Sequence, residues 1–167
     1  KLAEQSGLGE LLGGSPSMRR MFDLLESVAG SDANVLIVGE SGTGKELAAN
    51  ALHAKSTRAG GPMVKINCAA LPKDLIESEL FGHVKGAFTG ATTDKAGLLE
   101  EAHKGSVLLD EITEMPMDLQ AKLLRVLEDR QVRRLGGSRT VPVDFRLLCS
   151  TNRDPESAVR EGKLRQD

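Results

Sequence analysis

Asn34-Val-Leu-Ile-Val-Gly-Glu-Ser-Gly-Thr-Gly-Lys45 is the most informative segment of the chain, because a short apolar run turns into a glycine-rich loop and then enters a helical pattern through a lysine. The spacing Gly39-x4-Gly44-Lys45 lets successive backbone N–H groups curl around phosphate oxygens without a Cβ in the way. The following helix would present its positive N-terminal end, and Lys45 adds a point charge. The pattern predicts a phosphate-binding loop for a nucleoside triphosphate.

The surroundings of this loop separate it from a chance match. Two glycines and a lysine at this spacing can arise by chance in a chain with 18 Gly. Here, however, the apolar run Val35–Val38 precedes the loop and the helical pattern Leu47–His53 follows it. One position departs from the generic motif, because Glu46 stands where Ser or Thr usually holds Mg²⁺. A hydroxyl of the loop is therefore excluded as a metal ligand at that position.

Length and composition limit the class of protein. The 167 residues, 40% of them hydrophobic, suit one soluble domain with a real core. We find no apolar stretch of membrane-spanning length and no signal peptide, so we expect a cytoplasmic protein without a membrane partner. The net charge of −2 and the pI near 6.0 argue against a domain whose main task is to wrap nucleic acid.

The cysteines and histidines do not form a metal-binding pattern. Cys68 and Cys149 stand alone without a Cys-x-x-Cys pair, and we interpret them as small buried residues of a reducing cytosol. His53, His83 and His103 are too scattered to form an i, i+4 pair of ligands. Ordinary core or surface roles are expected for all five residues.

Strand-like and helix-like segments alternate along the chain. This alternation predicts an α/β fold in which helices cover a parallel sheet, and the continuous apolar strands suit a sheet buried on both faces. The opening stretch Lys1–Ser15 is Gly-rich and is interpreted as a connector, and a helix is expected from Pro16 with Ser15 as its cap. The alternating segments are Val35–Val38, Leu47–His53, Met63–Asn67, Asp74–Phe81, Ser106–Asp110, Asp118–Glu128 and Phe145–Ser150.

Two adjacent carboxylates end the apolar run Val107–Leu109. Asp110 could simply cap the next helix, and Glu111 could be solvated. In a sheet of this kind, however, ligands gather at the carboxyl ends of the strands beside the phosphate loop. We therefore predict that Asp110 holds Mg²⁺ through water and that Glu111 orients or deprotonates the attacking water.

Another apolar run ends in polar residues at Thr151 and Asn152. These side chains could hydrogen-bond a γ-phosphate. Taken alone, the pair is equally typical of the start of a turn.

Several motifs together make the chain resemble the AAA+ central ATPase domain of bacterial enhancer-binding proteins, the NtrC-like activators of sigma-54 RNA polymerase. The resemblance runs from about Leu12 to Asp167, and Gly86–Ala91 is its most specific motif. Glu46 is usual in that family. The motifs that carry the resemblance are Gly39–Glu46, Asn67–Leu71, Glu79–His83, Gly86–Ala91, Leu109–Ile112, Gln120–Leu127 and Thr151–Asn152.

The resemblance implies a P-loop AAA+ fold with a three-layer αβα core and two loop insertions, together with a set of site residues. Asn67 matches a residue that restrains the catalytic glutamate, Thr151 with Asn152 matches the γ-phosphate sensor, and Arg165 matches an arginine supplied to a neighbouring subunit. Leu12 and Gly13 would lie by the adenine. The residues expected around ATP and Mg²⁺ are Gly39, Glu40, Ser41, Gly42, Thr43, Gly44, Lys45, Glu46, Asp110 and Glu111.

The same resemblance gives the two insertions a role. The first loop would contact the sigma factor through Gly86, Ala87, Phe88, Thr89, Gly90 and Ala91. Judged on composition alone, Phe88 would fold back into the core. The second insertion, Gln131–Phe145, would be a hairpin with Gly136 and Gly137 at its tip. Its surroundings carry four arginines that could be a solvated cluster, a subunit contact or a promoter-DNA contact: Arg130, Arg133, Arg134 and Arg139.

Two departures qualify the resemblance. Val84 stands before Lys85 and Gly86 where the family more often has an acidic or amide residue. The sequence also stops at Asp167, before the helical lid and a second trans-acting arginine, and it contains no regulatory or DNA-binding domain. We thus expect a connector over residues 1–15 and an incomplete AAA+ α/β subdomain over residues 16–167, a fragment or a truncated form that is inactive or weak in isolation.

The resulting expectation is an ATPase that remodels the sigma-54 RNA polymerase holoenzyme in a hexameric or heptameric homo-oligomeric ring, with promoter or enhancer DNA bound mainly by other domains. One alternative is another AAA+ machine, such as a helicase loader or chelatase subunit. The other is a nucleotide-binding assembly module that does not hydrolyse ATP.

Overall fold

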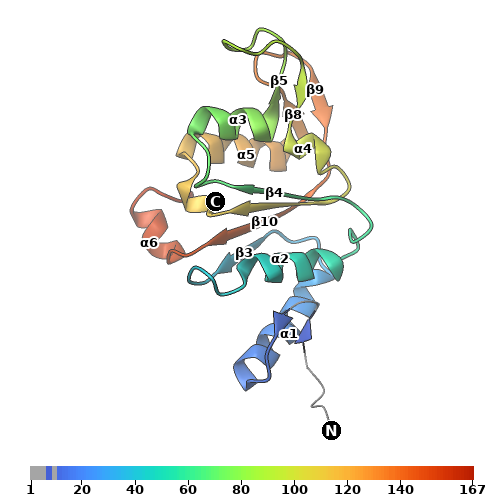
Figure 1. Cartoon of the computed structure of the whole chain (residues 1–167), viewed down its shortest axis with the longest axis vertical. Helices are drawn as coiled ribbons and strands as arrows, with labels where there is room; N and C mark the ends of the chain where they lie inside the picture. The colour runs from blue at the N-terminus through green and yellow to red at the C-terminus, as the bar shows by residue number, and fades with distance from the viewer. Residues whose placement is uncertain (1–6, 9–10) are drawn as a thin grey trace.

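A four-stranded parallel sheet forms the centre of the molecule (Figure 1). The computed structural model describes residues 7–8 and 11–167. The strands are β3 (Val35–Val38), β4 (Met63–Asn67), β7 (Ser106–Asp110) and β10 (Arg146–Thr151), in the spatial order β3-β10-β7-β4. β7 and β10 lie in the middle and are almost wholly buried, as continuous apolar strands should be. The predicted parallel sheet is confirmed.

Helices cover both faces of the sheet and make three layers (Figure 1). α1 and α2 pack on one face, while α3, α4 and α5 pack on the other. The helices are α1 (Pro16–Ala29), α2 (Lys45–Ala54), α3 (Lys73–Phe81), α4 (Leu98–Glu101), α5 (Met117–Asp129) and α6 (Pro155–Arg160). None of the helices in the described ranges has the length and apolar character needed to span a bilayer.

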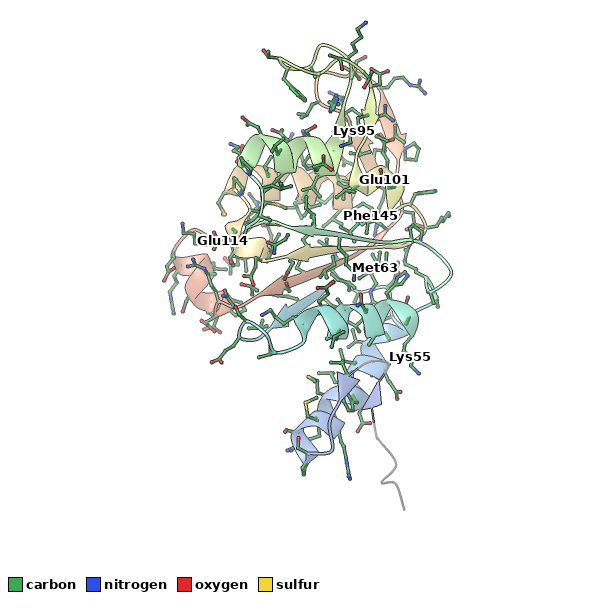
Figure 2. All side chains as sticks on the ribbon, viewed as in Figure 1. Lys55, Met63, Lys95, Glu101, Glu114 and Phe145 are labelled. Carbon is green, nitrogen blue, oxygen red and sulfur yellow. The ribbon has the colours of Figure 1, made fainter. Side chains whose placement is uncertain are left out.

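Alternate side chains of the central strands divide the core between the two faces. Leu108 and Leu148 point to the face where Leu52 of α2 is wholly buried. Val107 and Phe145 belong to the larger cluster on the opposite face, and Figure 2 shows Phe145 between the sheet and the helices above it. The sheet is thereby packed on both faces.

The N-terminal helix is fixed at both ends. Ser15 accepts a hydrogen bond from the Met18 amide at 3.3 Å, and Pro16 occupies the first turn, as the sequence predicted. Arg146, only 1% exposed, donates to the carbonyls of Val28 and Ala29 at the other end. These bonds satisfy carbonyl groups that a helix leaves unpaired at its C-terminus.

The stretch predicted to be a connector contains two short strands, β1 (Gly7–Leu8) and β2 (Leu11–Leu12), which pair antiparallel. Leu11 is 6% exposed and packs in a cluster with Phe22, Ala48 and Ala51. This residue is therefore part of the folded unit. The domain boundary at Ser15 remains a prediction.

Two hairpin insertions extend from the helical layer at the top of Figure 1. The first contains β5 (Gly82–His83) and β6 (Lys95–Ala96), and the second contains β8 (Gln131–Arg133) and β9 (Thr140–Pro142). The two are joined by backbone hydrogen bonds at residue 135, whose carbonyl accepts from residue 84 at 3.0 Å and whose amide donates to residue 82 at 2.9 Å. The insertions therefore form one connected unit.

Candidate functional site

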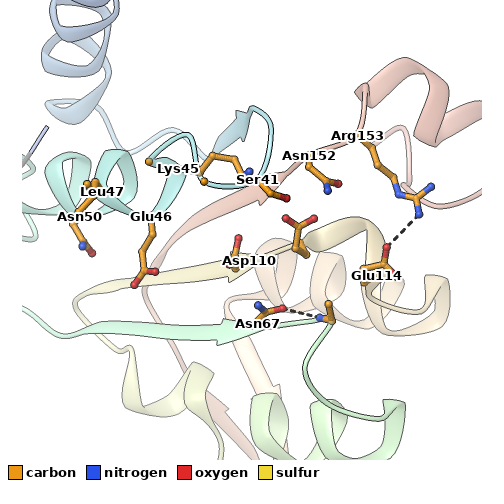
Figure 3. A pocket seen from close by; sticks show the side chains of 14 residues that line it. Ser41, Lys45, Glu46, Leu47, Asn50, Asn67, Asp110, Glu114, Asn152 and Arg153 are labelled. Atoms are coloured by element: carbon orange, nitrogen blue, oxygen red, sulfur yellow. Dashed lines mark hydrogen bonds and ion pairs between the residues drawn. The ribbon is translucent and has the colours of Figure 1, made fainter. Parts of the chain in front are cut away.

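The carboxyl ends of the four parallel strands meet at one edge of the sheet. The phosphate loop follows β3, and Asn67, Asp110 and Thr151 are the last residues of the other three strands. A cavity of about 970 Å³ opens there, and Figure 3 shows Lys45, Asp110 and Asn152 around it. Its walls also include Ser41, Gly42, Gly44, Glu46, Asn50, Asn67, Glu111, Glu114 and Arg153.

The phosphate loop has the backbone shape that its glycines allow. Gly42 and Gly44 adopt φ angles of +80° and +87°, a region that side chains with a Cβ disfavour. A Cβ at Gly39 would come within 2.8 Å of the Thr43 hydroxyl, which donates to the Glu40 carbonyl. Substitution at these glycines would thus deform the loop.

Lys45 begins α2 and lies within the loop. Its ammonium group donates to the carbonyls of Gly39 at 2.7 Å and Glu40 at 2.9 Å. The ammonium group is thus a positive donor beside the loop, where phosphate oxygens would compete with these carbonyls for it. Glu46 lines the same cavity, and its carboxylate pairs with Lys65 at 3.0 Å.

The two carboxylates after β7 lie on the cavity wall. Asp110 accepts a hydrogen bond from the Ser150 hydroxyl of the neighbouring strand. Glu111 has a left-handed backbone conformation, with φ 56° and ψ 56°, and it precedes the short 3-10 helix Ile112–Glu114. A non-glycine residue in this region is strained, and such strain is typical of functional sites. The structure gives Asp110 no role as a helix cap.

Asn67 ends β4 directly opposite Asp110 in the strand pairing. Its side-chain oxygen accepts from the Ala69 amide at 2.9 Å, the bond drawn in Figure 3. Within the described ranges, no hydrogen bond joins Asn67 to Glu111. Both side chains line the same cavity, so the restraint expected from Asn67 stays a prediction.

Thr151 and Asn152, at the end of β10, differ in their exposure. Asn152 is exposed and lines the cavity. Thr151 is wholly buried; its hydroxyl lies 3.2 Å from that of Thr113 and accepts from the Arg153 amide at 3.1 Å. A direct contact with a phosphate is thus open to Asn152, whereas Thr151 lies beneath the cavity wall.

Arg165 lies away from the phosphate cavity in this chain. Its guanidinium pairs with Asp167 at 2.8 Å, and its amide donates to the Gln120 side chain at 3.0 Å. Over a third of its side chain is exposed. Arg165 is thus accessible to a neighbouring chain, and its expected contact with that chain's nucleotide stays a prediction.

The residues expected near the adenine are described only in part. Of Leu12 the structure describes the backbone, and its side chain lies outside the described part. Gly13 packs so closely on Met18 that a Cβ there would lie 2.9 Å from that side chain. Leu11 approaches the phosphate loop instead, since its methyl group lies 3.5 Å from the Cβ position of Gly44.

The loop Gly86–Ala91 is exposed over most of its length. Gly86 and Gly90 have φ angles of +84° and +96° with open space around them. Phe88 is 45% exposed and does not fold into the core, although its ring meets that of His83 edge-on at 4.9 Å. The packing expected from composition alone is therefore wrong for Phe88.

The four arginines of the second insertion have different surroundings. Arg134 makes a two-pronged ion pair with Glu100 at 2.8 and 2.9 Å, and Arg130 donates to the Phe145 carbonyl at 3.4 Å. Arg133 and Arg139 are exposed. Only part of this cluster is thus free to meet a partner.

The cysteines are free thiols that the chain keeps protonated. Burial, with the nearby charges of Asp110 and Glu111, raises the pKa of Cys68 to about 12. Burial also raises the pKa of Cys149 to about 12. A thiolate nucleophile is therefore absent from the cavity at neutral pH.

Sequence reasoning missed several residues at this site. Ser150 contacts both carboxylate-bearing residues, and Arg153 forms an ion pair with Glu114 at 3.3 Å on the cavity wall. Asn50 also lines the cavity, from α2. Ser150 and Arg153 lie in the strand end that carries Thr151 and Asn152, but their partners are about forty residues away in sequence and follow from no local motif.

The residues present fit a nucleoside triphosphate with Mg²⁺. The loop offers backbone donors, positive-φ glycines and a lysine, while Asp110 and Glu111 offer hard oxygen ligands. Within the described residues, no three His, Cys, Asp or Glu side chains form a metal site by themselves. Proteins usually hold Mg²⁺ through one or two carboxylates together with substrate phosphates and water, so Asp110 and Glu111 would be enough protein ligands for it.

Comparison with known proteins gives consistent matches. A family model described as "Sigma-54 interaction domain" matches residues 11–167. The regulatory protein AtoC of Escherichia coli (strain K12) is 56% identical over 159 residues, which are 95% of this chain and 34% of that protein. The chain thus spans about a third of the length of this relative.

Solved structures agree with the fold. The crystal structure of NtrX from Brucella abortus in complex with ATP matches with a TM-score of 0.86 and 43% identity, covering 95% of this chain and 34% of that one. The P-loop NTPase domain of an E. coli sigma-54 activator matches with a TM-score of 0.59 at 18% identity, covering 91% of this chain and 86% of that one. The predicted α/β P-loop fold is confirmed.

Proposed function

The chain belongs to the sigma-54 interaction domain family, the AAA+ ATPase domain of NtrC-like transcriptional activators, and from this premise we propose that it hydrolyses ATP to remodel the sigma-54 RNA polymerase holoenzyme. The observation that carries the proposal is the convergence of Lys45, Asp110, Glu111 and Asn152 on one cavity at the carboxyl edge of the sheet. The relative NtrX, whose structure contains ATP, supports ATP as the nucleotide.

The residues divide the chemistry among them. Backbone N–H groups of residues 39–45 and the Lys45 ammonium would bind the phosphates. Asp110 would hold Mg²⁺ through water, and the ion would neutralise charge on the phosphate oxygens. Glu111 would orient the attacking water and accept its proton, and Asn152 would contact the γ-phosphate.

Turnover would require a ring of subunits. Arg165 lies outside the phosphate cavity of its own chain and is partly exposed. We assign it to the neighbouring subunit's nucleotide, where it would stabilise charge that develops in the transition state. Asn67 and Thr151 would report the state of the nucleotide to the rest of the domain.

The loop Gly86–Ala91 would be the part that engages sigma-54. An exposed Phe88 between two unobstructed glycines can change position without unpacking a core. Hydrolysis would shift the loop between lowered and raised states. The second insertion would move with it, because Leu135 bonds Gly82 and Val84 at the base of the first insertion. DNA contacts would come mainly from other parts of the full-length protein.

The test uses the full-length protein with sigma-54 and a transition-state analogue of ATP hydrolysis. Wild-type protein should bind sigma-54 only with the analogue present, and Phe88→Ala and Thr89→Ala should lose that binding while ATP affinity stays within about twofold of wild type. Because Phe88 is exposed, its substitution should not disturb folding, so a loss of sigma-54 binding would report on the contact itself. Leu75→Ala, which alters another exposed apolar side chain, is the matched control.

Three outcomes would separate the alternatives. Sigma-54 binding that survives both loop substitutions would contradict the assigned role of the loop. ATP hydrolysis without any sigma-54 binding would favour another AAA+ machine. ATP binding without turnover in a folded, assembled protein would favour a nucleotide-binding assembly module.

A further inference from the structure

Ser150 occupies a central place beside both carboxylates of the cavity. It is the penultimate residue of β10, and its side chain is 1% exposed. Its hydroxyl donates to Oδ1 of Asp110 and accepts a hydrogen bond from the Glu111 amide at 3.3 Å. One hydroxyl has a single proton and two lone pairs, so the two bonds can exist together.

One of these hydrogen bonds constrains the side chain of Asp110, and the other constrains the backbone of Glu111. The bond to Asp110 uses the one proton of the hydroxyl and fixes the rotation of that carboxylate. The bond from the Glu111 amide holds a backbone with φ 56° and ψ 56°, a conformation that costs free energy for any residue with a Cβ. A second backbone bond, from the Glu114 amide to the Glu111 carbonyl at 3.0 Å, supports the same turn from the other side.

We propose that Ser150 is a positioning residue that sets the orientation of Asp110 and the backbone of Glu111 for ATP hydrolysis. The inference rests on the proposed ATPase function of the same cavity. Ser150 is itself buried and does not line the cavity, so it would act only through the two carboxylate residues. Groups that orient a metal-holding or catalytic side chain in this way typically change activity or metal affinity about 10–100-fold when removed.

A purely structural role is the competing explanation, because a buried hydroxyl always needs partners. The chain offers a matched control for it. Ser106 is equally buried, lies on the neighbouring strand β7, and bonds His53 at 2.9 Å at the opposite end of the sheet. Ser106→Ala therefore removes the same group from the same sheet without touching Asp110 or Glu111.

The experiment measures ATP hydrolysis and ATP binding in the full-length protein. We expect Ser150→Ala to lower kcat about tenfold or more and to raise the Mg²⁺ concentration needed for half-maximal rate, with a smaller change in KM for ATP. The affinity for ATP in EDTA should stay near that of wild type, since the phosphate loop is unchanged, while the gain in affinity that Mg²⁺ adds should shrink. Ser106→Ala should leave all five quantities within about twofold of wild type.

A cysteine variant separates hydrogen bonding from packing. Ser150→Cys keeps a side chain of similar size, but a thiol is a weak donor and acceptor. It should therefore behave like Ser150→Ala. Thermal unfolding of each variant, recorded beside the kinetics, ensures that all measurements refer to folded protein.

The outcomes distinguish this inference from the proposed function. Ser150→Ala with wild-type kcat and wild-type Mg²⁺ dependence would overturn the positioning role and leave the ATPase function intact. An equal loss in Ser106→Ala, or a fully active Ser150→Cys, would also overturn it in favour of stability or packing. Wild-type protein that fails to bind ATP would overturn both.

Discussion

The two ends of the parallel sheet use similar polar side chains in opposite ways. At the amino end, Arg146 donates to three backbone carbonyls and His53 bonds both Ser106 and the Gly61 carbonyl. Arg58 joins two acidic side chains there. At the carboxyl end, Lys45, Asp110, Glu111 and Asn152 line an open cavity.

The contrast teaches how to separate structural from functional polar groups. At the amino end the chain itself supplies the partners of Arg146, His53 and Arg58, so these polar groups stabilise the fold. At the carboxyl end, a strained Glu111 and a glycine loop with positive φ angles keep polar groups beside open space. Substitutions at the two ends should therefore affect different measurements.

The largest expected effect is on nucleotide binding. Lys45→Ala removes the positive donor at the mouth of the phosphate loop, so ATP binding should become undetectable. The free energy of unfolding should change little, because Lys45 donates only to carbonyls of its own loop. Isothermal titration measures the first quantity and urea denaturation the second, with the exposed Lys55→Ala as control. Normal ATP affinity in Lys45→Ala would contradict the assignment of the cavity.

The second largest expected effect is on the rate of ATP hydrolysis. Arg165→Ala in the full-length protein should bind ATP normally yet lose about 10³-fold or more in hydrolysis, because an arginine supplied in trans stabilises the transition state. Mixing this variant with Lys45→Ala subunits should restore some activity, since one type of interface would then carry both an intact loop and an intact arginine. Full turnover by a monomer, independent of protein concentration, would rule out a trans role.

At the amino end of the sheet, a substitution should affect stability instead of ATP binding. Arg146→Ala should lower the free energy of unfolding by about 3 kcal/mol or more, since a hydrogen bond to a charged group contributes about 1.5–3 kcal/mol. The carbonyls of Ala29 and Ala33 would lose this donor, whereas the Val28 carbonyl would keep its bonds from Ser31. Urea denaturation of the chain measures the loss, and ATP affinity of the folded fraction should stay unchanged. A small change in stability would show that water replaces the guanidinium.

A smaller effect depends on pH. Arg58 lowers the pKa of Asp32 and Asp144 below the usual 3.8, mainly through side-chain hydrogen bonds. A depressed pKa contributes stability that is present above pH 3.8 and is lost as the pH falls through the folded-state value. Both carboxylates are about half exposed, so Asp144→Asn should change stability at pH 7 by under about 1 kcal/mol. Equal loss of stability by Asp144→Asn at pH 7 and at pH 2.5 would contradict this linkage.

The smallest expected effect is the change in the free energy of unfolding caused by Phe88→Ala. Phe88→Ala should change the free energy of unfolding by under about 0.5 kcal/mol, as is usual for exposed positions. Phe81→Ala is the matched control, because that ring is wholly buried and its loss should cost about 3–5 kcal/mol. Similar losses in the two variants would make Phe88 a core residue and remove the basis for its role in sigma-54 contact.

Local sequence patterns predicted most of the fold. The strands Val35–Val38, Met63–Asn67 and Ser106–Asp110 have the predicted bounds, because each is a short apolar run that ends at a polar residue. The segment before Ser15 was harder to interpret. Its glycines suggested a connector, whereas the packing of Leu11 against α2 depends on tertiary contacts that no local pattern reveals.

The site was predicted only where a motif carries its chemistry. Spacing and strand position predict the phosphate loop, Asp110 and Glu111, and the structure brings all of them to the same edge of the sheet, while their roles stay predictions. Ser150 was missed because a serine inside an apolar strand has no distinctive pattern, and its partners are set by strand order. Thr151 points beneath the cavity wall, since alternate strand residues face opposite sides.

The most direct test of the central claim measures ATP binding and ATP hydrolysis on the same sample of the full-length Glu111→Gln protein. Glu111 would act on the attacking water and Lys45 on the phosphates, so this variant should bind ATP as tightly as wild type and lose nearly all turnover. Unchanged turnover would contradict the catalytic role of Glu111, and lost ATP binding would contradict the division of labour between the phosphate loop and the carboxylates.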